Sequence, residues 1–333
     1  MKVLVTGILS QKAAANLKQH TTSVDIYESD DALDPDAIVA RLKGKDALVC
    51  LLGDKVNAQL LDKCPDLKLV ANVAVGYDNI NVGDATERGV LITNTPGVLD
   101  NATADLAFGL LLSAARRISE SDRFVRDGKW QGWKRDLMLG QELHGKTLGI
   151  VGLGRIGKAF AKRAQAFGLK IIYTKRSADQ SEEAELKKLF DAEKVELDDL
   201  CERSDFISIH CPLTPLTKHL IGKKQFSKMR PNCVLVNTSR GAVIDEAALV
   251  EALSTNKIAA AGLDVFEKEP AVSPELLNLE NVVMTPHIGS ASRETREAMD
   301  ELAIAGLISA FAKKCPQNAV NPDAWDKFAG RLS

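Results

Sequence analysis

A glycine-rich turn near the middle of the chain constrains the fold more than any other feature. The apolar run Leu148–Val151 predicts a buried parallel strand, and Lys158–Phe167 has the spacing of an amphipathic helix. Between them lies a G-x-G-x-x-G sequence, formed by Gly152, Gly154 and Gly157. In a dinucleotide site these glycines allow a tight turn, close approach of a pyrophosphate and close helix packing. Because a further strand, Leu169–Tyr173, follows, the context favours a dinucleotide-binding unit over a structural turn.

The first hundred residues predict a separate α/β domain ahead of this turn. Strand-like runs such as Lys2–Val5 and Ala47–Leu51 alternate with helix-like runs, which is the pattern of a doubly wound parallel sheet. The turn residues 94–97 end this domain, and a second α/β domain runs from Lys146 to about Pro286. Its later strands are expected at 206–210, 233–237, 260–264 and 282–284. Long helices are expected over about 101–126 and 292–312.

The composition disfavours several classes of protein. Lys and Arg number 43 against 45 Asp and Glu, so the net charge of −2 gives no support for a nucleic-acid partner. The best candidate for a membrane span, Leu106–Ala115, is too short, and the chain begins with a strand-like run instead of a signal peptide. The six cysteines lack metal-ligand spacing, so we expect reduced core thiols, no metal site and a cytoplasmic protein.

The end of the strand after the glycine turn bears on the choice of cofactor. An Asp or Glu normally binds the ribose 2′-hydroxyl of NAD about 20 residues past such a turn. Here Thr174, Lys175 and Arg176 stand in that place, followed by Ser177. Two cations attract a 2′-phosphate, and Arg binds phosphate through two parallel hydrogen bonds, so the sequence favours NADP. A solvated basic turn is the alternative, and NAD use stays open because Asp179 is near enough to fold back.

Three more expected strands end in polar residues, at the edge where open α/β sheets bind ligands. The first leads to Arg240, the second to Glu267 and Glu269, and the third to His287. A cation that polarises a carbonyl and a histidine that supplies a proton suit hydride reduction of a 2-oxo acid, and a nearby Glu stabilises the charged histidine. Surface or capping roles are the alternative for these residues, and His210 competes with His287 as the proton donor.

Several longer motifs together resemble the D-isomer-specific 2-hydroxyacid dehydrogenases. The chain looks most like the glyoxylate/hydroxypyruvate reductase branch, which also contains 2-ketogluconate reductases. The match covers essentially the whole chain. It rests on residues 73–80 (VAVGYDNI), 94–98 (NTPGV), 102–105 (ATAD), 152–157 (GLGRIG), 210–214 (HCPLT), 237–241 (NTSRG), 264–270 (DVFEKEP) and 285–289 (TPHIG).

The resemblance implies roles for the residues at the strand ends. It implies that Arg240 binds the 2-oxo acid group, that His287 donates the proton and that Glu269 pairs with His287. It therefore selects Glu269 over Glu267. It also selects His287 over His210, whose segment is expected to line the cofactor.

The resemblance also implies which residues bind the small molecules. The backbone amides of Val75 and Gly76 match a loop that receives the substrate carboxylate, and Asp264 matches a residue near the nicotinamide carboxamide. Thr103 matches a position near the cofactor phosphates or nicotinamide. The full set expected to bind the cofactor is Gly152, Gly154, Arg155, Ile156, Gly157, Thr174, Lys175, Arg176, Thr103, His210, Pro212, Thr238 and Asp264.

The architecture implied is α/β, with two doubly wound Rossmann-like domains. Residues 1–100 and 290–333 are expected to form the substrate-binding domain, and residues 101–289 an NADP-binding domain inserted in it. The expected protein is a homodimer that reduces glyoxylate or hydroxypyruvate with NADPH. Trp130 and Trp133 match the family, but 134–139 lacks the tryptophan that reaches a neighbouring active site in some reductases. The alternatives are a 2-ketogluconate reductase, an NAD-linked dehydrogenase of the same family and a dinucleotide-gated, corepressor-like binding protein.

Overall fold

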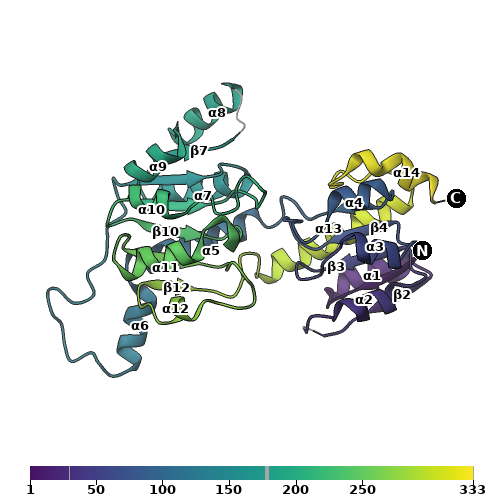
Figure 1. The fold of residues 1–333 in the computed structure, drawn as a ribbon, viewed down its shortest axis with the longest axis horizontal. Coiled ribbons are helices and arrows are strands. Elements are labelled where there is room, and N and C mark those ends of the chain that lie inside the picture. The colour runs from purple at the N-terminus through teal and green to yellow at the C-terminus, as the bar shows by residue number, and fades with distance from the viewer. Residues whose placement is uncertain (30, 177–179, 333) are drawn as a thin grey trace. The chain divides into compact units, whose positions relative to one another are not determined.

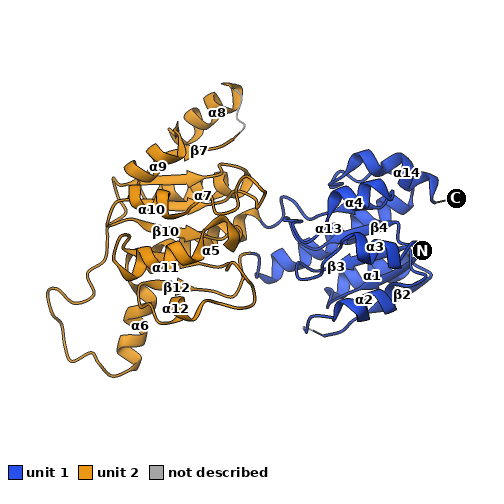
Figure 2. Ribbon diagram, viewed as in Figure 1, with its two compact units in different colours: residues 1–99, 290–333 blue, residues 100–289 orange. Residues whose placement is uncertain are grey.

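The computed structural model describes residues 1–29, 31–176 and 180–332, and the chain divides into two compact units (Figure 2). Unit 1 consists of residues 1–99 and 290–333, and unit 2 of residues 100–289. Each unit has one parallel sheet with helices between its strands (Figure 1), which confirms two doubly wound α/β domains, the second inserted in the first. The expected bounds, 1–100 with 290–333 and 101–289, differ from the two units by one residue.

The sheet of unit 1 has the strand order β2-β1-β3-β4-β5, with every neighbouring pair parallel. Every residue of β3 and β4 is buried, so these strands read as apolar runs without the alternation of a half-exposed sheet. Helix α13 packs against α1, β4 and β5, so the C-terminal segment completes this core. The elements are β1 (Lys2–Val5), α1 (Gln11–Gln19), β2 (Ser23–Ile26), α2 (Pro35–Leu42), β3 (Ala47–Cys50), α3 (Ala58–Lys63), β4 (Leu69–Asn72), α4 (Val82–Glu87), β5 (Leu91–Thr93), α13 (Arg293–Phe311), η2 (Pro322–Ala324) and α14 (Trp325–Gly330).

The sheet of unit 2 has the order β12-β11-β10-β9-β6-β7-β8, again all parallel. The order reverses at β6, and open α/β sheets bind ligands beyond the carboxyl ends of strands at such a switch point. The elements are α5 (Asp100–Ala115), α6 (Ile118–Arg126), β6 (Thr147–Val151), α7 (Arg155–Ala166), β7 (Lys170–Thr174), α8 (Gln180–Phe190), β8 (Glu193–Lys194), α9 (Leu197–Arg203), β9 (Phe206–Ile209), α10 (Lys223–Lys228), β10 (Val234–Asn237), η1 (Gly241–Val243), α11 (Glu246–Ser254), β11 (Ala260–Leu263), α12 (Pro274–Leu277) and β12 (Val282–Met284).

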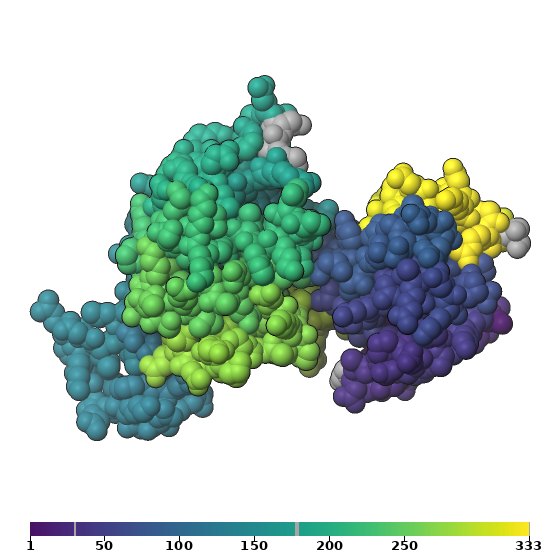
Figure 3. Space-filling model, viewed as in Figure 1, coloured from purple at the N-terminus to yellow at the C-terminus, as the bar shows by residue number. Residues whose placement is uncertain are grey.

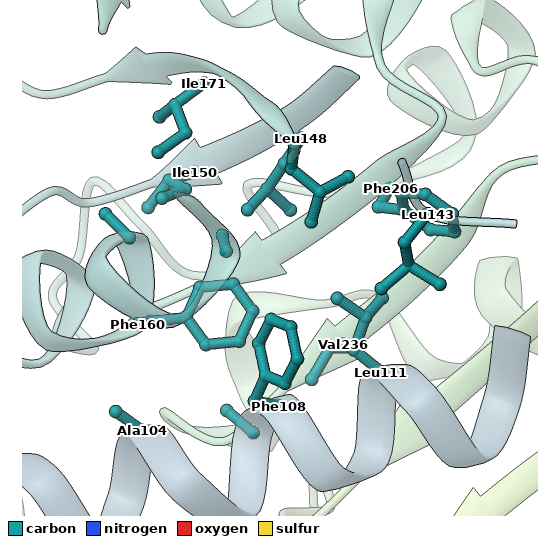
Figure 4. Packing of buried hydrophobic residues seen from close by; sticks show 14 of the residues in the cluster. Ala104, Phe108, Leu111, Leu143, Leu148, Ile150, Phe160, Ile171, Phe206 and Val236 are labelled. Atoms are coloured by element: carbon teal, nitrogen blue, oxygen red, sulfur yellow. The ribbon is translucent and has the colours of Figure 1, made fainter. Parts of the chain in front are cut away.

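Helix α5 forms the floor of one core of unit 2. It packs against α7, β10 and β11, and its residues Ala104, Phe108 and Leu111 point into a cluster under the sheet (Figure 4). The rings of Phe108 and Phe160 lie 5.6 Å apart between centroids, in a tilted arrangement. Because Phe160 is on α7, this contact fixes the helix that follows the glycine turn.

The single helix expected over about 101–126 is wrong, because α5 ends at Ala115 and α6 begins at Ile118. Arg117 adopts φ +55°, a left-handed conformation that breaks the helical ladder. The Ala115 carbonyl accepts a hydrogen bond from the Gln141 N–H at 2.8 Å instead. The break thus coincides with a contact to a segment that lies 26 residues further along the chain.

After the break, α6 and the stretch behind it form an arm, defined here as residues 118–139. No residue of α6 is buried. The arm extends away from the rest of unit 2 (Figure 3) and carries five apolar side chains that are 53% to 84% exposed: Ile118, Val125, Trp130, Trp133 and Leu139. Exposed apolar side chains gathered on one segment mark a candidate interaction surface.

Within the described ranges, no helix is long and apolar enough to cross a membrane. No group of three or more His, Cys, Asp or Glu side chains among those residues is arranged to hold a metal ion. All six cysteines lie in the described part of the chain and are free thiols. Four are buried, as expected for core residues, whereas Cys211 is half-buried and Cys315 is exposed.

Candidate active site

The glycine turn joins β6 to α7, and packing requires two of its three glycines. Gly152 has φ +94°, and a Cβ there would lie 2.7 Å from the Cys211 nitrogen. A Cβ on Gly157 would lie 2.5 Å from the Gly152 carbonyl oxygen, which holds the helix against the turn. A Cβ on Gly154 would meet nothing within 4 Å. The first and third glycines thus serve packing, while the second leaves open space at the start of α7.

This open space fits a dinucleotide phosphate group. Gly154 is the N-cap of the 12-residue helix α7 and provides no side-chain cap, so the first helical N–H groups are available to an anion. An independent observation agrees with this. The Thr238 hydroxyl, from the turn after β10, is buried without a hydrogen-bond partner among the described residues, as is one carboxylate oxygen of Asp100. Asp100 escaped sequence reasoning, and its other oxygen lies 3.7 Å from Arg155.

The basic segment after β7 is less uniformly positive than its sequence suggests. The Lys175 ammonium lies 2.6 Å from a carboxylate oxygen of Glu182, in the first turn of α8, and Lys158 lies 3.6 Å from the same oxygen. Arg176 is exposed and makes no ion pair with any residue that the structure describes. Ser177 and Asp179 lie outside the described residues. Of Lys175 and Arg176, therefore, only Arg176 has a charge that no described carboxylate compensates.

His287 and Glu269 form a pair beyond the ends of β12 and β11. The His287 Nδ1 donates to Glu269 Oε2 at 2.7 Å, and Glu269 Oε1 accepts from the Phe266 N–H at 3.0 Å. Burial raises the pKa of Glu269, but these hydrogen bonds and the charges of His287 and Arg240 outweigh burial and hold the pKa below 4.5. The carboxylate is thus ionised, fixed in orientation, and bound to one side of the imidazole.

Asp264 anchors the segment that carries His287. It is fully buried, and its carboxylate accepts hydrogen bonds from the Thr285 hydroxyl at 2.6 Å and from the Ile288 and Gly289 N–H groups at 2.8 Å each. Burial raises the pKa of Asp264 despite these bonds. The His287 backbone has φ +53°, and its N–H donates to the Asp264 carbonyl at 2.9 Å. The structure therefore gives Asp264 a function in shaping this turn, which sequence reasoning missed.

Arg240 follows a turn that Asn237 organises. The Asn237 amide oxygen accepts from the Ser239 N–H and hydroxyl, at 3.0 and 2.9 Å, and its amide nitrogen donates to the Arg240 carbonyl at 2.9 Å. The guanidinium donates to the Ser239 carbonyl at 2.8 Å. Next in the chain, a Cβ on Gly241 would lie 1.9 Å from the Phe266 carbonyl carbon, so the Arg240 turn and the Glu269 segment are in direct contact.

His210 lies at the end of β9 and is unsuited to donate protons. Its Nε2 is 2.9 Å from the Ser208 hydroxyl, and its ring packs 4.9 Å from the ring of Phe160. Burial lowers the pKa of His210 to about 3, because the charged form loses its solvation. The residue is neutral near pH 7, and of His210 and His287 only His287 is paired with a carboxylate. Further along, Pro212 accepts a hydrogen bond from Thr217 at its carbonyl.

Thr103, on α5, is the remaining cofactor candidate in unit 2. It is buried, and its methyl carbon would lie 3.4 Å from a Cβ on Gly289. The start of α5 is therefore next to the end of the His287 segment. Val75 and Gly76 follow β4 in unit 1, at the carboxyl edge of that sheet.

A cavity of about 550 Å³ among the described residues lies elsewhere. Leu139, Gly140 and Gln141 line it, together with Val234 and Ala260, the first residues of β10 and β11. It is thus at the amino edge of the sheet, opposite the carboxyl edge that carries His287 and the glycine turn. We place the candidate active site at the carboxyl edge, because the titratable residues and the open helix terminus are there.

Comparison with known proteins identifies the family of the chain. Residues 108–289 match the family described as D-isomer specific 2-hydroxyacid dehydrogenase, NAD binding domain. A glyoxylate reductase from Thermococcus litoralis is 52% identical over 327 residues, which cover 97% of each chain. A crystal structure from Thermus thermophilus has a TM-score of 0.88 at 40% identity, covering 96% of this chain and all of that one. The NADPH-dependent glyoxylate/hydroxypyruvate reductase of Sinorhizobium meliloti, in complex with NADP and malonate, has a TM-score of 0.85 at 34% identity, covering 97% of both chains.

The fold and the residues at its carboxyl edge thus define an oxidoreductase that uses a nicotinamide dinucleotide. More narrowly, the chain belongs to the D-isomer specific 2-hydroxyacid dehydrogenase family, with its relatives in the glyoxylate reductase branch.

Proposed function

We propose that the protein is an NADPH-preferring reductase of small 2-oxo acids, with glyoxylate and hydroxypyruvate as its substrates. The observation that carries the proposal is the His287–Glu269 pair at 2.7 Å, with the charge of Arg240 acting on the same carboxylate. The glyoxylate reductase from Thermococcus litoralis and the Sinorhizobium meliloti enzyme support the choice of substrate.

The residues around the glycine turn hold the dinucleotide in this proposal, and it supplies the hydride. The amides of Gly154, Arg155 and Ile156 face the pyrophosphate at the uncapped start of α7. Thr103, Thr238, Pro212 and the neutral His210 line the same carboxyl edge. Thr238 supports this assignment, because its hydroxyl is buried and still lacks a partner among the described residues.

His287 acts as the proton donor. Its Nδ1 is bound to Glu269, so Nε2 is the nitrogen left to face a substrate oxygen. The ionised Glu269 orients the ring for the transfer of the proton. Arg240 holds the 2-oxo acid and stabilises the charge that develops on its carbonyl oxygen, while the Val75 and Gly76 amides receive the carboxylate.

The preference for NADPH rests on Arg176. Lys175 shares its charge with Glu182 at 2.6 Å, which leaves Arg176 to bind a 2′-phosphate. Among the described residues, no carboxylate follows β7 directly, where a ribose-binding acid would stand.

A homodimer completes the proposal. The arm exposes Trp133 at 84% and Leu139 at 63%, and burying such side chains against a second copy removes apolar surface from water. A cytoplasmic location is part of the same proposal, supported by the six free thiols.

A kinetic panel tests the function. Purified protein is assayed with glyoxylate, hydroxypyruvate, pyruvate and 2-ketogluconate, each with NADPH and with NADH. We expect turnover with glyoxylate and hydroxypyruvate and a lower KM for NADPH than for NADH. In the same assay, His287→Ala and Arg240→Ala should each lose nearly all turnover. Failure of the wild-type protein to oxidise NADPH with any of the four acids would refute the function, and near-normal activity in either variant would refute the role of that residue.

A further inference from the structure

Hydrogen bonds to its carbonyl groups fix the backbone of the loop after β4, at residues 74–76. Its three successive carbonyl groups each accept a hydrogen bond from the protein. The Ala74 carbonyl accepts from the Thr95 N–H at 3.0 Å, the Val75 carbonyl from the Asn94 side-chain amide at 2.8 Å, and the Gly76 carbonyl from the Asn72 side-chain amide at 2.8 Å.

Each of these carbonyls shares a peptide plane with the N–H group of the next residue, and these three N–H groups remain available to a ligand. The C=O and N–H of a trans peptide point in opposite directions, so fixing a carbonyl fixes the next amide. The three bonds therefore fix the N–H groups of Val75, Gly76 and Tyr77, none of which donates to any residue that the structure describes. Neighbouring amides without an acceptor among the described residues are available to bind an anion.

The two asparagines are themselves held firmly. Asn72 is fully buried, and its oxygen accepts from Asn79 at 3.4 Å. Asn94 is 9% exposed and is bound twice to Asn318. The Asn94 N–H donates to the Asn318 carbonyl at 3.2 Å, and the Asn318 side-chain amide donates to the Asn94 carbonyl at 2.7 Å. A residue from the C-terminal segment thus supports the loop through Asn94.

We propose that Asn94, supported by Asn318, and Asn72 are positioning residues that aim the loop amides at the substrate carboxylate. The inference rests on the proposed function, since it takes the carboxylate of a 2-oxo acid as the anion. With the carbonyls held, the amides need no reorganisation when the anion binds. Without these side chains the peptide planes are free to rotate. Ordering them when the anion binds then reduces the binding free energy.

The variant Asn94→Asp tests the inference, because it replaces the donor to the Val75 carbonyl with an acceptor of the same shape. The matched control is Asn321→Asp. Asn321 is also buried, at 5% exposure, and its amide donates to the Val90 carbonyl at 3.0 Å, away from the loop. Both variants lose a hydrogen bond from a buried asparagine to a backbone carbonyl, and the control also loses one to the Thr86 hydroxyl, so both should lower the melting temperature. Only Asn94→Asp should impair carboxylate binding.

The measurements are steady-state kinetics with glyoxylate, calorimetric binding of the unreactive carboxylate oxamate, and binding of NADPH. For Asn94→Asp we expect KM and the oxamate Kd to rise about tenfold or more, with smaller changes in kcat and an NADPH Kd within about twofold of wild type. The control should keep all of these constants within about twofold. If Asn94→Asp does not fold, Asn318→Ala, which removes the support of Asn94, should raise the oxamate Kd about threefold.

An Asn94→Asp protein that loses stability like the control, yet keeps its KM and oxamate Kd, would overturn the inference. The proposed function and the role of the loop are refuted by different results. If the wild type reduces no 2-oxo acid, the proposed function fails, while oxamate binding still tests the loop. If the wild type does not bind oxamate at all, the loop is not a carboxylate site and the inference fails with it.

Discussion

Replacing Arg176 should change the choice between the two nicotinamide cofactors. Lys175 is 2.6 Å from Glu182, so its charge is already compensated, and Arg176 remains to bind a 2′-phosphate. A hydrogen bond to a charged group contributes about 1.5 to 3 kcal/mol, and the exposure of Arg176 places it at the lower end of that range. Since about 1.4 kcal/mol is tenfold, Arg176→Ala should raise the NADPH KM about tenfold and leave the NADH KM within about twofold.

The assay is steady-state reduction of glyoxylate with each cofactor at low and high salt. The increase in NADPH KM should shrink at high salt, because exposed charges are screened. Lys188→Ala is the matched control, since it removes one exposed cation from α8 nearby. A second variant, Glu182→Gln, releases Lys175 and should lower the NADPH KM. Equal changes with NADPH and NADH in Arg176→Ala would refute a contact with the 2′-phosphate.

Three further variants separate packing from chemistry. Gly157→Ala forces a Cβ to within 2.5 Å of the Gly152 carbonyl oxygen, so it should lower both the melting temperature and the cofactor affinity. A Cβ in Gly154→Ala meets nothing within 4 Å, so this variant should lower the cofactor affinity alone. Calorimetry measures the melting temperatures, and titration with the cofactor measures the affinities. Glu269→Gln should destabilise the fold near neutral pH by a difference that disappears in acid. The pKa of Glu269 is depressed on folding, so its pair with His287 stabilises the protein above about pH 4.5 and is lost as the pH falls through the folded pKa. Thermal melts of this variant and wild type at several pH values measure that difference, and a gap that is the same at every pH would contradict it.

The elements that the sequence predicts well are those whose signals are local. The glycine turn directly follows its apolar strand, β6. In the same way, polar residues follow within a few positions of the ends of β10, β11 and β12. Parallel strands then bring these ends to one edge without any further information. The choice of Glu269 over Glu267 came from the family motif and agrees with the geometry, since Glu269 is the acid that contacts His287.

The features that escaped prediction depend on contacts outside the local pattern, some of them with residues far away in the sequence. The Ala115 carbonyl at the end of α5 is bound by Gln141, and the charge of Lys175 is compensated by Glu182 on the next helix. The apolar periodicity of 101–126 reports only which face of a helix is buried, and it contains no signal for a left-handed Arg117. From the sequence, Asp264 is likewise only a polar residue at the end of a strand. In the structure its carboxylate binds the N–H groups of Ile288 and Gly289, more than 20 residues further on.

The division of unit 1 into two segments has a consequence for synthesis on the ribosome. Unit 2 is continuous, so all of it has been made once residue 289 is added. At that point unit 1 is incomplete, because α13 and the two asparagines that bind at β5 have not yet been made. Asn321 binds the Ile92 N–H within β5, and Asn318 binds the carbonyl of Asn94, the residue after β5. Domains tend to fold as units while the chain emerges, so the inserted unit should acquire protease resistance before the unit that begins at the first residue. Nascent chains arrested at successive lengths would then protect residues 100–289 earlier than residues 1–99.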